Sequence, residues 1–149
     1  MKWSLHRKKA IEVIDKDVAL AKHNKGIGYT VVLSEMGIIT NVIEVEKEGV
    51  VVRFMNEDIE TYLLYGFQRC GETDIFLNMV YYYNYQNSQE IENIFFNFKE
   101  NGEMAIERRN LITGELEEKE AIVDVSCNWE RFPEFGDYLK LVLLHRKLY

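Results

Sequence analysis

The chain has 149 residues, of which 13% are aromatic, 47% hydrophobic and 29% charged, and its formal net charge is −7. This length and composition predict one globular domain over residues 1–149 and exclude a disordered chain. The sequence has no apolar run of 18 residues and no basic segment followed by an apolar one, so we expect a cytoplasmic protein that does not contact a membrane.

The charge is unevenly distributed along the chain. Residues 1–25 hold seven Lys or Arg against three Asp or Glu, a balance of +4, whereas residues 26–149 hold eleven against twenty-two, a balance of −11. A strongly acidic body repels phosphate backbones and attracts basic proteins. We therefore predict a basic protein partner and no direct contact with nucleic acid. The alternative, that the charge serves only solubility, stays open.

The first predicted element is an amphipathic helix over residues 3–22. Its apolar residues recur at steps of three and four positions, which is typical of one buried helical stripe. Gly26 and Gly28 are expected to end this helix. The stripe comprises Leu5, Ala10, Ile11, Ile14, Val18 and Ala21.

Short β-rich runs follow and predict an antiparallel meander of about seven or eight strands. The candidate strands are residues 29–34, 38–46, 50–55, 59–66, 73–83, 94–99, 104–109 and 116–125. Tight turns with positive φ are predicted at Gly37, Gly49, Gly102 and Gly114, and Asn101-Gly102 is the strongest hairpin signal. Apolar residues at helical spacing after Pro133 predict a closing helix over residues 134–148. The predicted fold class is therefore α+β, with a helix at each end of the meander.

Alternation along the run 73–83 predicts which of its side chains are buried. The predicted core face carries Ile75, Leu77, Met79, Tyr81 and Tyr83. The opposite face carries Asp74, Phe76, Asn78, Val80 and Tyr82.

A mixed acidic and aromatic sheet face is the predicted partner-binding surface. Exposed tyrosines give a large contact area at low entropic cost, and carboxylates beside them attract a cationic partner. Tyr82 is the predicted anchor, unless a helix or loop covers it, and the glutamates could instead only guard a sheet edge. The predicted binding residues are Glu60, Tyr62, Asp74, Phe76, Tyr82, Glu117, Glu118 and Glu120.

Motifs for catalysis, metals and cofactors are not found. The sequence Gly26-Ile27-Gly28 lacks the third glycine of a dinucleotide loop, and the three histidines form no two-histidine metal motif. Cys70 and Cys127 have no close second Cys or His and are expected to be reduced thiols. We predict a protein that is not an enzyme and uses no cofactor or metal.

One tract near the end of the chain resembles a known family. Its sequence is Asn128-Trp129-Glu130-Arg131-Phe132-Pro133-Glu134-Phe135-Gly136-Asp137-Tyr138. With the hairpin strands before it, it is similar to the C-terminal end of small bacterial immunity proteins, which neutralise polymorphic toxins such as those of LXG-type secreted proteins. The resemblance covers the final third, from Asn101-Gly102 to Tyr138. It implies an antitoxin that binds a basic cognate toxin domain, expected to be a nuclease, and occludes its cationic active site.

Two further expectations concern the aromatic residues. Trp129, Phe132 and Phe135 are predicted to clamp the link between the sheet and the closing helix, with Trp129 buried beneath that helix. A different function is a small-ligand carrier whose meander encloses an aromatic cavity. That cavity would be lined by Tyr65, Phe67, Tyr81, Tyr83 and Phe96.

Overall fold

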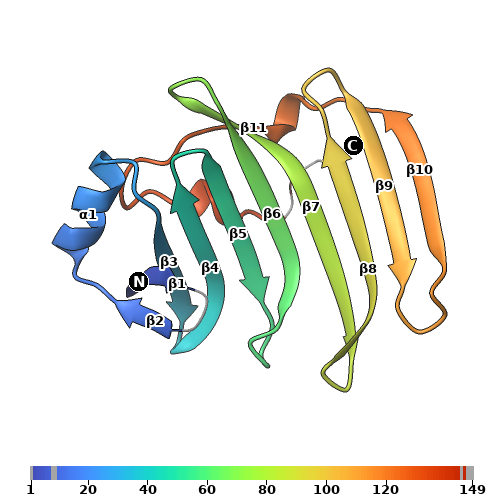
Figure 1. The fold of residues 1–149 in the computed structure, drawn as a ribbon, viewed down its shortest axis with the longest axis horizontal. Coiled ribbons are helices and arrows are strands. Elements are labelled where there is room, and N and C mark those ends of the chain that lie inside the picture. Colours follow the sequence, from blue (N-terminus) through green and yellow to red (C-terminus); the bar gives the residue numbers. More distant parts are fainter. Residues whose placement is uncertain (1, 8–9, 145, 147–149) are drawn as a thin grey trace.

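The computed structural model describes residues 2–7, 10–144 and 146, which form a single antiparallel sheet with one short α-helix (Figure 1). Within these residues the sheet has eleven strands in the order β10-β9-β8-β7-β6-β5-β4-β3-β1-β2, and β11 pairs with β7. The strands are β1 (Lys2–Arg7), β2 (Ala10–Val13), β3 (Tyr29–Glu35), β4 (Ile38–Glu46), β5 (Gly49–Met55), β6 (Thr61–Cys70), β7 (Asp74–Gln86), β8 (Gln89–Phe98), β9 (Glu103–Asn110), β10 (Leu116–Ile122) and β11 (Trp129–Arg131). The helical elements are α1 (Lys16–Asn24) and two 3-10 turns, η1 (Ser126–Asn128) and η2 (Leu139–Val142).

The predicted antiparallel meander is confirmed, because strands β3 to β10 each pair with the next strand in the sequence. Three of the four predicted turn glycines have a positive φ, namely Gly37 (82°), Gly102 (91°) and Gly114 (76°). The fourth, Gly49, begins strand β5 instead. A Cβ at Gly49 would lie 2.1 Å from the carbonyl oxygen of Phe67, so this glycine permits a close approach of two strands.

The predicted N-terminal helix over residues 3–22 is wrong for most of its length. Strands β1 and β2 form a hairpin there, and β1 pairs with β3 in the register Lys2↔Val32. This pairing covers the edge of β3, and such tertiary contacts override a helical spacing. The helix is limited to α1, where Val18 of the predicted stripe is exposed and Ala19 is the buried residue. None of the described helices is long and apolar enough to cross a membrane.

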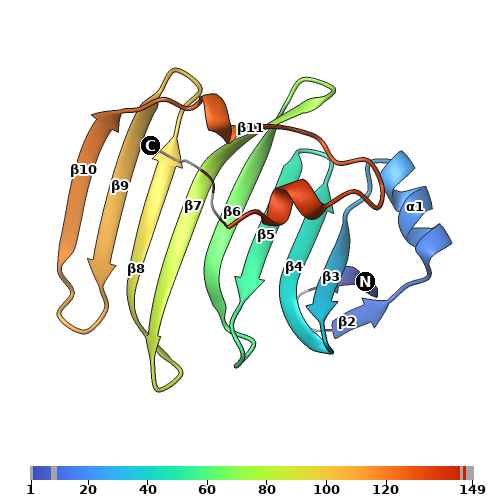
Figure 2. The ribbon, with the colours of Figure 1, turned by 180° about the vertical axis from the view of Figure 1, so that it is seen from behind.

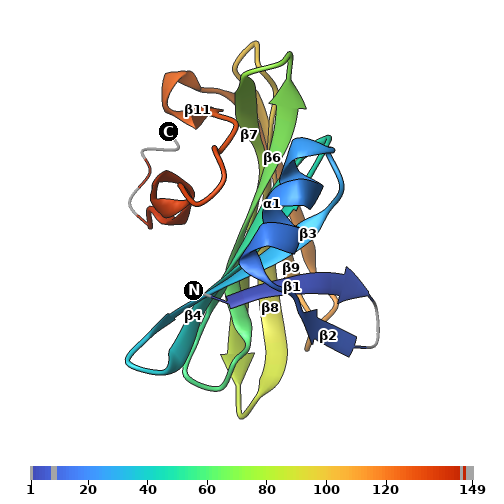
Figure 3. The same ribbon diagram turned by 90° about the vertical axis from the view of Figure 1, so that its left-hand side faces the viewer.

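The chain after β10 lies across one face of the sheet, which we call the inner face (Figures 2 and 3). This C-terminal segment, residues 123–144, passes through η1 and β11, approaches α1 and returns through η2 (Figure 2). The opposite, outer face has no described element over strands β5 to β9 (Figures 1 and 3). The core therefore lies between the inner face and the C-terminal segment.

The predicted closing helix is not found over residues 134–144, where η2 is the helical element, and positions 145, 147 and 148 lie outside the described residues. Tyr138 and Leu141 are buried in the core, and one 3-10 turn presents both, since they are three positions apart. The Tyr65 hydroxyl donates to the carbonyl oxygen of Leu143 at 3.2 Å. A longer helix would need that acceptor for its own backbone.

The aromatic anchors of this segment follow the prediction only in part. Trp129 is 39% exposed and lies on β11 opposite Phe76, with their ring centres 4.9 Å apart. It is therefore not buried beneath a helix, which corrects the prediction. Phe132 and Phe135 are partly buried against the core, and the ring of Phe135 lies 5.8 Å from that of His23 in α1.

A β-bulge in β7 changes which of its side chains reach the core. Phe67 of β6 pairs with Leu77, but the preceding Gly66 pairs with Met79, so Asn78 is an extra residue. Residues beyond this bulge exchange faces relative to a regular strand. The predicted core set is therefore divided: Ile75 and Leu77 are buried on the inner face, whereas Met79, Tyr81 and Tyr83 lie on the outer face. Val80 and Tyr82, predicted to face outward, lie on the inner face.

Candidate functional site

The outer face, which no described element covers over strands β5 to β9 (Figures 1 and 3), carries a group of large, half-buried side chains. It lies along β7 because successive outward positions after the bulge are occupied by long or aromatic residues. We call it the outer aromatic strip, and it comprises Met79, Tyr81, Tyr83 and Tyr85 of β7 and Phe95 of β8.

Ring stacking holds the centre of the outer aromatic strip. Tyr81 pairs with Phe95 across β7 and β8, and their ring centres are 4.3 Å apart with an interplanar angle of 22°. Tyr83 stacks on the other side, 5.8 Å from Tyr81 at 11°. Each such pair adds about 0.5–1.5 kcal/mol beyond area burial. The three rings are thus held in place before any partner arrives, which lowers the entropic cost of binding.

The hydroxyls of Tyr83 and Tyr85 in the strip remain protonated. Burial raises the pKa of Tyr83, and the neighbouring Tyr81 raises it further. Burial and the carboxylate of Glu90 likewise raise the pKa of Tyr85, whose hydroxyl donates to the carbonyl oxygen of Thr61 at 2.8 Å. Tyr83 and Tyr85 therefore present neutral hydroxyl groups, although that of Tyr85 already donates its hydrogen to Thr61.

Carboxylates flank the strip on the β9 and β10 side. Strand register places Glu107 of β9 directly beside Phe95, and Glu118 of β10 beside Glu107. Glu120 is two residues along β10, on the same face. Arg109, opposite Asn93, is a cation of this region. Glu107 thus lies next to the Phe95 ring, and Glu118 and Glu120 lie one strand further out on the same face.

A shallow groove borders the strip on the β4 side. It has a volume of about 270 Å³, and Gly66, Met79 and Val51 contribute to its apolar lining. Glu44, Glu46 and Glu48 also line the groove. A Cβ at Gly66 would lie 2.8 Å from the Met79 Cε, so this glycine lets Met79 lie flat on the sheet. The groove combines an apolar floor with carboxylates, a combination that suits the stem and head group of a lysine or arginine.

One glutamate of the groove is already paired within the protein. The guanidinium of Arg53 lies 3.4 Å from the Glu44 carboxylate. The Arg53 side chain is 36% exposed and that of Glu44 13%. A partner's basic side chain would therefore meet Glu46 and Glu48 more readily than Glu44.

The rings and charges of this surface can bind a partner noncovalently. Within residues 2–7, 10–144 and 146, no group of three or more His, Cys, Asp or Glu residues could hold a metal ion. Cys70 and Cys127 are both free thiols. Stacked rings at the centre with charged groups around them match the anatomy of protein interfaces.

The eight predicted binding residues do not form one surface. Glu118 and Glu120 lie on the outer face, but Glu117 between them points to the inner face, opposite Arg108. Tyr82 is 37% exposed, also on the inner face, where its ring lies 6.0 Å from that of Phe96. The predicted anchor is therefore on the opposite side of the sheet from Glu118 and Glu120.

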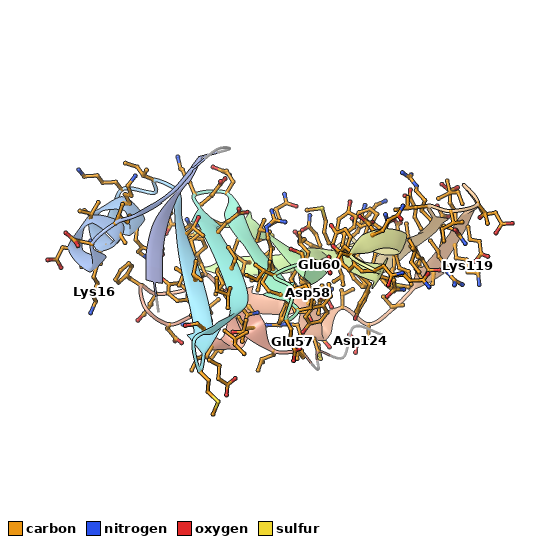
Figure 4. The ribbon with its side chains drawn as sticks, turned by 90° about the horizontal axis from the view of Figure 1, so that it is seen from below. Lys16, Glu57, Asp58, Glu60, Lys119 and Asp124 are labelled. Atoms are coloured by element: carbon orange, nitrogen blue, oxygen red, sulfur yellow. The ribbon has the colours of Figure 1, made fainter. Side chains whose placement is uncertain are left out.

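The other predicted residues lie at the ends of strands. Phe76 is on the outer face but only 2% exposed, because it is buried next to Trp129, and Asp74 begins β7. Glu60 accepts a hydrogen bond from Asn56 in the turn between β5 and β6, away from β10 (Figure 4). Tyr62 is partly buried and packs near Phe54, with ring centres 6.4 Å apart. None of these four joins the outer aromatic strip.

The residues proposed for a ligand cavity are also divided between the two faces. Tyr65, Phe67 and Phe96 lie on the inner face, whereas Tyr81 and Tyr83 lie on the outer one. These five side chains therefore do not enclose a common cavity.

The strip was missed because regular alternation assigned Tyr81 and Tyr83 to the core. The sequence signal that could have indicated it is the run of tyrosines at 81, 82, 83 and 85, which places aromatic rings on both faces in any register. Phe95 was not assigned to either face.

No known protein family, curated protein or solved structure matches this chain.

Proposed function

We propose that this protein is an antitoxin of the immunity type, which binds a basic toxin domain through the outer face of its sheet and blocks the toxin's active site. The observation that carries the proposal is the uncovered outer aromatic strip between carboxylates. Rigid aromatic side chains are the usual anchors of protein interfaces, and the surrounding charges set the association rate.

The charge of the chain supports a basic partner. Residues 26–149 have a balance of −11, and Glu107, Glu118 and Glu120 place part of it beside the strip. Nuclease active sites are cationic because they bind phosphate, so a nuclease domain is the partner that fits best. Covering such a site would exclude its nucleic-acid substrate without any chemical step.

The tract that resembles immunity proteins lies apart from this surface. Asn128, fully buried, donates from Nδ2 to the carbonyl oxygen of Leu77 at 2.9 Å, and Tyr138 is buried in the core. The tract therefore holds the C-terminal segment on the inner face. The resemblance of this tract supports the proposal of an immunity protein, and the outer aromatic strip supports the proposal that the toxin binds the outer face.

Titration against the toxin domain encoded by the neighbouring gene tests the proposal. Tyr81→Ala should weaken binding at least about tenfold, chiefly through faster dissociation, because a central anchor is lost. Tyr82→Ala is the matched control, since it removes the same side chain from the next position on the opposite face, and it should change affinity less than about twofold.

Two results would overturn the proposal. The first is the lack of any complex at micromolar protein concentration. The second is a loss of binding in Tyr82→Ala with full binding in Tyr81→Ala, because this would place the partner on the inner face. Urea denaturation of both variants separates lost contact from lost folding.

A further inference from the structure

Strand β10 forms one end of the sheet and has an unpaired edge. It pairs with β9 along its whole length, and no other described strand pairs with it. All seven of its residues are exposed, and it has neither a proline nor a bulge. Natural sheet edges are commonly protected by prolines, bulges or charged side chains, because an open edge can accept another strand, and β10 has only the charged side chains.

The hydrogen bonds of the β9–β10 hairpin identify the backbone groups on this edge. At one end the Asn110 N–H donates to the Glu115 carbonyl oxygen, and at the other the Val123 N–H donates to the Gly102 carbonyl oxygen, both at 2.9 Å. In an antiparallel pair, alternate residues bond the partner strand. The residues that bond β9 are therefore Glu117, Lys119 and Ala121. The residues with outward N–H and C=O groups are Leu116, Glu118, Glu120 and Ile122.

We propose that this edge of β10 accepts an extended basic segment of the partner as an added strand. The inference rests on the proposed function and specifies how the partner is held. The outward backbone groups belong to the same residues whose side chains lie on the outer face. An added strand would therefore extend the outer face, with its own side chains beside Glu118 and Glu120.

Charge selects the kind of strand that fits. Lysine or arginine at alternate positions would lie opposite Glu118 and Glu120, where cross-strand pairs of opposite charge are favourable. Leu116 and Ile122, 48% and 77% exposed, offer apolar contacts at the two ends of the edge. A segment with basic residues at two alternate positions, and an apolar residue at the next alternate position on each side, satisfies both features, because all four β10 side chains lie on the outer face.

The same charges disfavour a second copy of this chain as the occupant. Antiparallel self-pairing centred on Lys119 would place Glu118 of one copy opposite Glu120 of the other. Like charges directly opposite one another destabilise a sheet. The edge is therefore protected against self-association while it remains complementary to a basic strand.

A synthetic peptide of four alternating Lys-Val pairs tests the added strand. With its lysines opposite Glu118 and Glu120, the lysine amides point toward β10 and the valine amides point away. N-methylation of the lysine amides should weaken binding at least about tenfold, because it removes the donors. N-methylation of the valine amides, which leaves charge and composition the same, should change binding little. The amides of Glu118 and Glu120 should become protected from hydrogen exchange only with the binding peptides.

A variant pair tests the same edge in the complete complex. Glu120→Pro removes an outward N–H without removing a bond to β9, and Glu120→Gln loses the same charge but keeps that N–H. Binding of the neighbouring gene's toxin domain should be at least about tenfold weaker for the proline variant than for the glutamine variant.

Equal binding of the two methylated peptides, or protection from hydrogen exchange at other strands, would overturn the proposal that β10 accepts an added strand. That result would leave the proposed function intact if Tyr81→Ala still weakened the toxin complex. Conversely, peptide pairing at β10 without any toxin complex would overturn the proposed function alone.

Discussion

The phenolic oxygens of Tyr29 and Tyr138 lie 2.9 Å apart, which joins β3 to a residue 109 positions later in the chain. The Tyr29 hydroxyl also lies 2.7 Å from the Nδ1 of His23, so three elements meet at one buried hydrogen-bonded group. Burial raises the pKa of both tyrosines, and both remain protonated. This group fastens the C-terminal segment at the α1 end of the sheet.

Tyr138→Phe should lower the free energy of unfolding by about 1 kcal/mol or somewhat more, because it removes the hydrogen bonds of the hydroxyl and leaves the ring in place. Leu141→Ala, in the same turn, should cost about 2–5 kcal/mol through loss of a buried side chain. Urea denaturation measures both. A larger effect for Tyr138→Phe than for Leu141→Ala would show that the hydrogen bonds, and not apolar packing, hold the segment.

The stability of the protein should depend on the protonation of His23. Burial, with the nearby positive charge of Arg69, lowers the pKa of His23 below 6.5. The unfolded chain then binds this proton more readily than the folded one, so protonation favours unfolding. The contribution of His23 is therefore complete above pH 6.5 and is lost as the pH falls through the lowered folded pKa.

Comparison with His23→Gln isolates this effect, since all other titrating groups are shared. The stability of the wild type relative to His23→Gln should be larger at about pH 8 than at about pH 5. A difference that stays constant with pH would show that the folded and unfolded pKa values of His23 are equal.

Charge reversal on β10 should slow association with the proposed toxin partner. Glu118→Lys combined with Glu120→Lys should reduce the association rate about tenfold at low salt, because steering charge is lost beside the strip. The matched control is Glu57→Lys combined with Asp58→Lys in the β5–β6 turn, away from β10 (Figure 4). This pair changes the net charge by the same amount as the β10 pair. Stopped-flow rates at low and high salt measure the effect. Equal slowing by both pairs would indicate that net charge matters, not its location.

The two thiols should differ in reactivity. The pKa of Cys70 is raised to about 11 by burial and by the Glu100 carboxylate, 3.2 Å from its Sγ, whereas Cys127 is exposed. Because the thiolate is the reactive form, a thiol reagent at about pH 8 should modify Cys127 quickly and Cys70 slowly. Cys127→Ser should remove the fast phase, and Cys70→Ser should preserve it. Two equally fast phases in the wild type would contradict this assignment.

The meander could be predicted from sequence because its signals are local. Strand β4 covers Ile38–Glu46 as predicted, and Gly102 and Gly114 turn the chain where expected. Alternating apolar residues and turn glycines act within a few positions. The predictions of the two terminal helices were wrong because long-range contacts determine those segments. The N-terminal segment pairs with β3, and the C-terminal segment packs against the inner face.

Half of the candidate site could be predicted and half could not. Glu118 and Glu120 were predicted on the same face and lie on the same face, but Glu117, predicted with them, lies on the opposite face as alternation requires. The aromatic half depends on the bulge at Asn78, which arises where Met79 packs over Gly66 of the neighbouring strand. Contacts between strands determine such a bulge, and β7 alone carries no sign of it.

The position of the C-terminal segment also sets an order of events during synthesis. Consecutive hairpins from β3 to β10 can pair as soon as each emerges from the ribosome, because their contacts are local. Tyr138 and Leu141, which cover the inner face, are made only after the whole meander. Until then Tyr65 and Val80, fully buried in the finished protein, remain open to water and to other chains. The nascent protein is thus most vulnerable to aggregation when strands β3 to β10 are complete and the C-terminal segment that covers them is still missing.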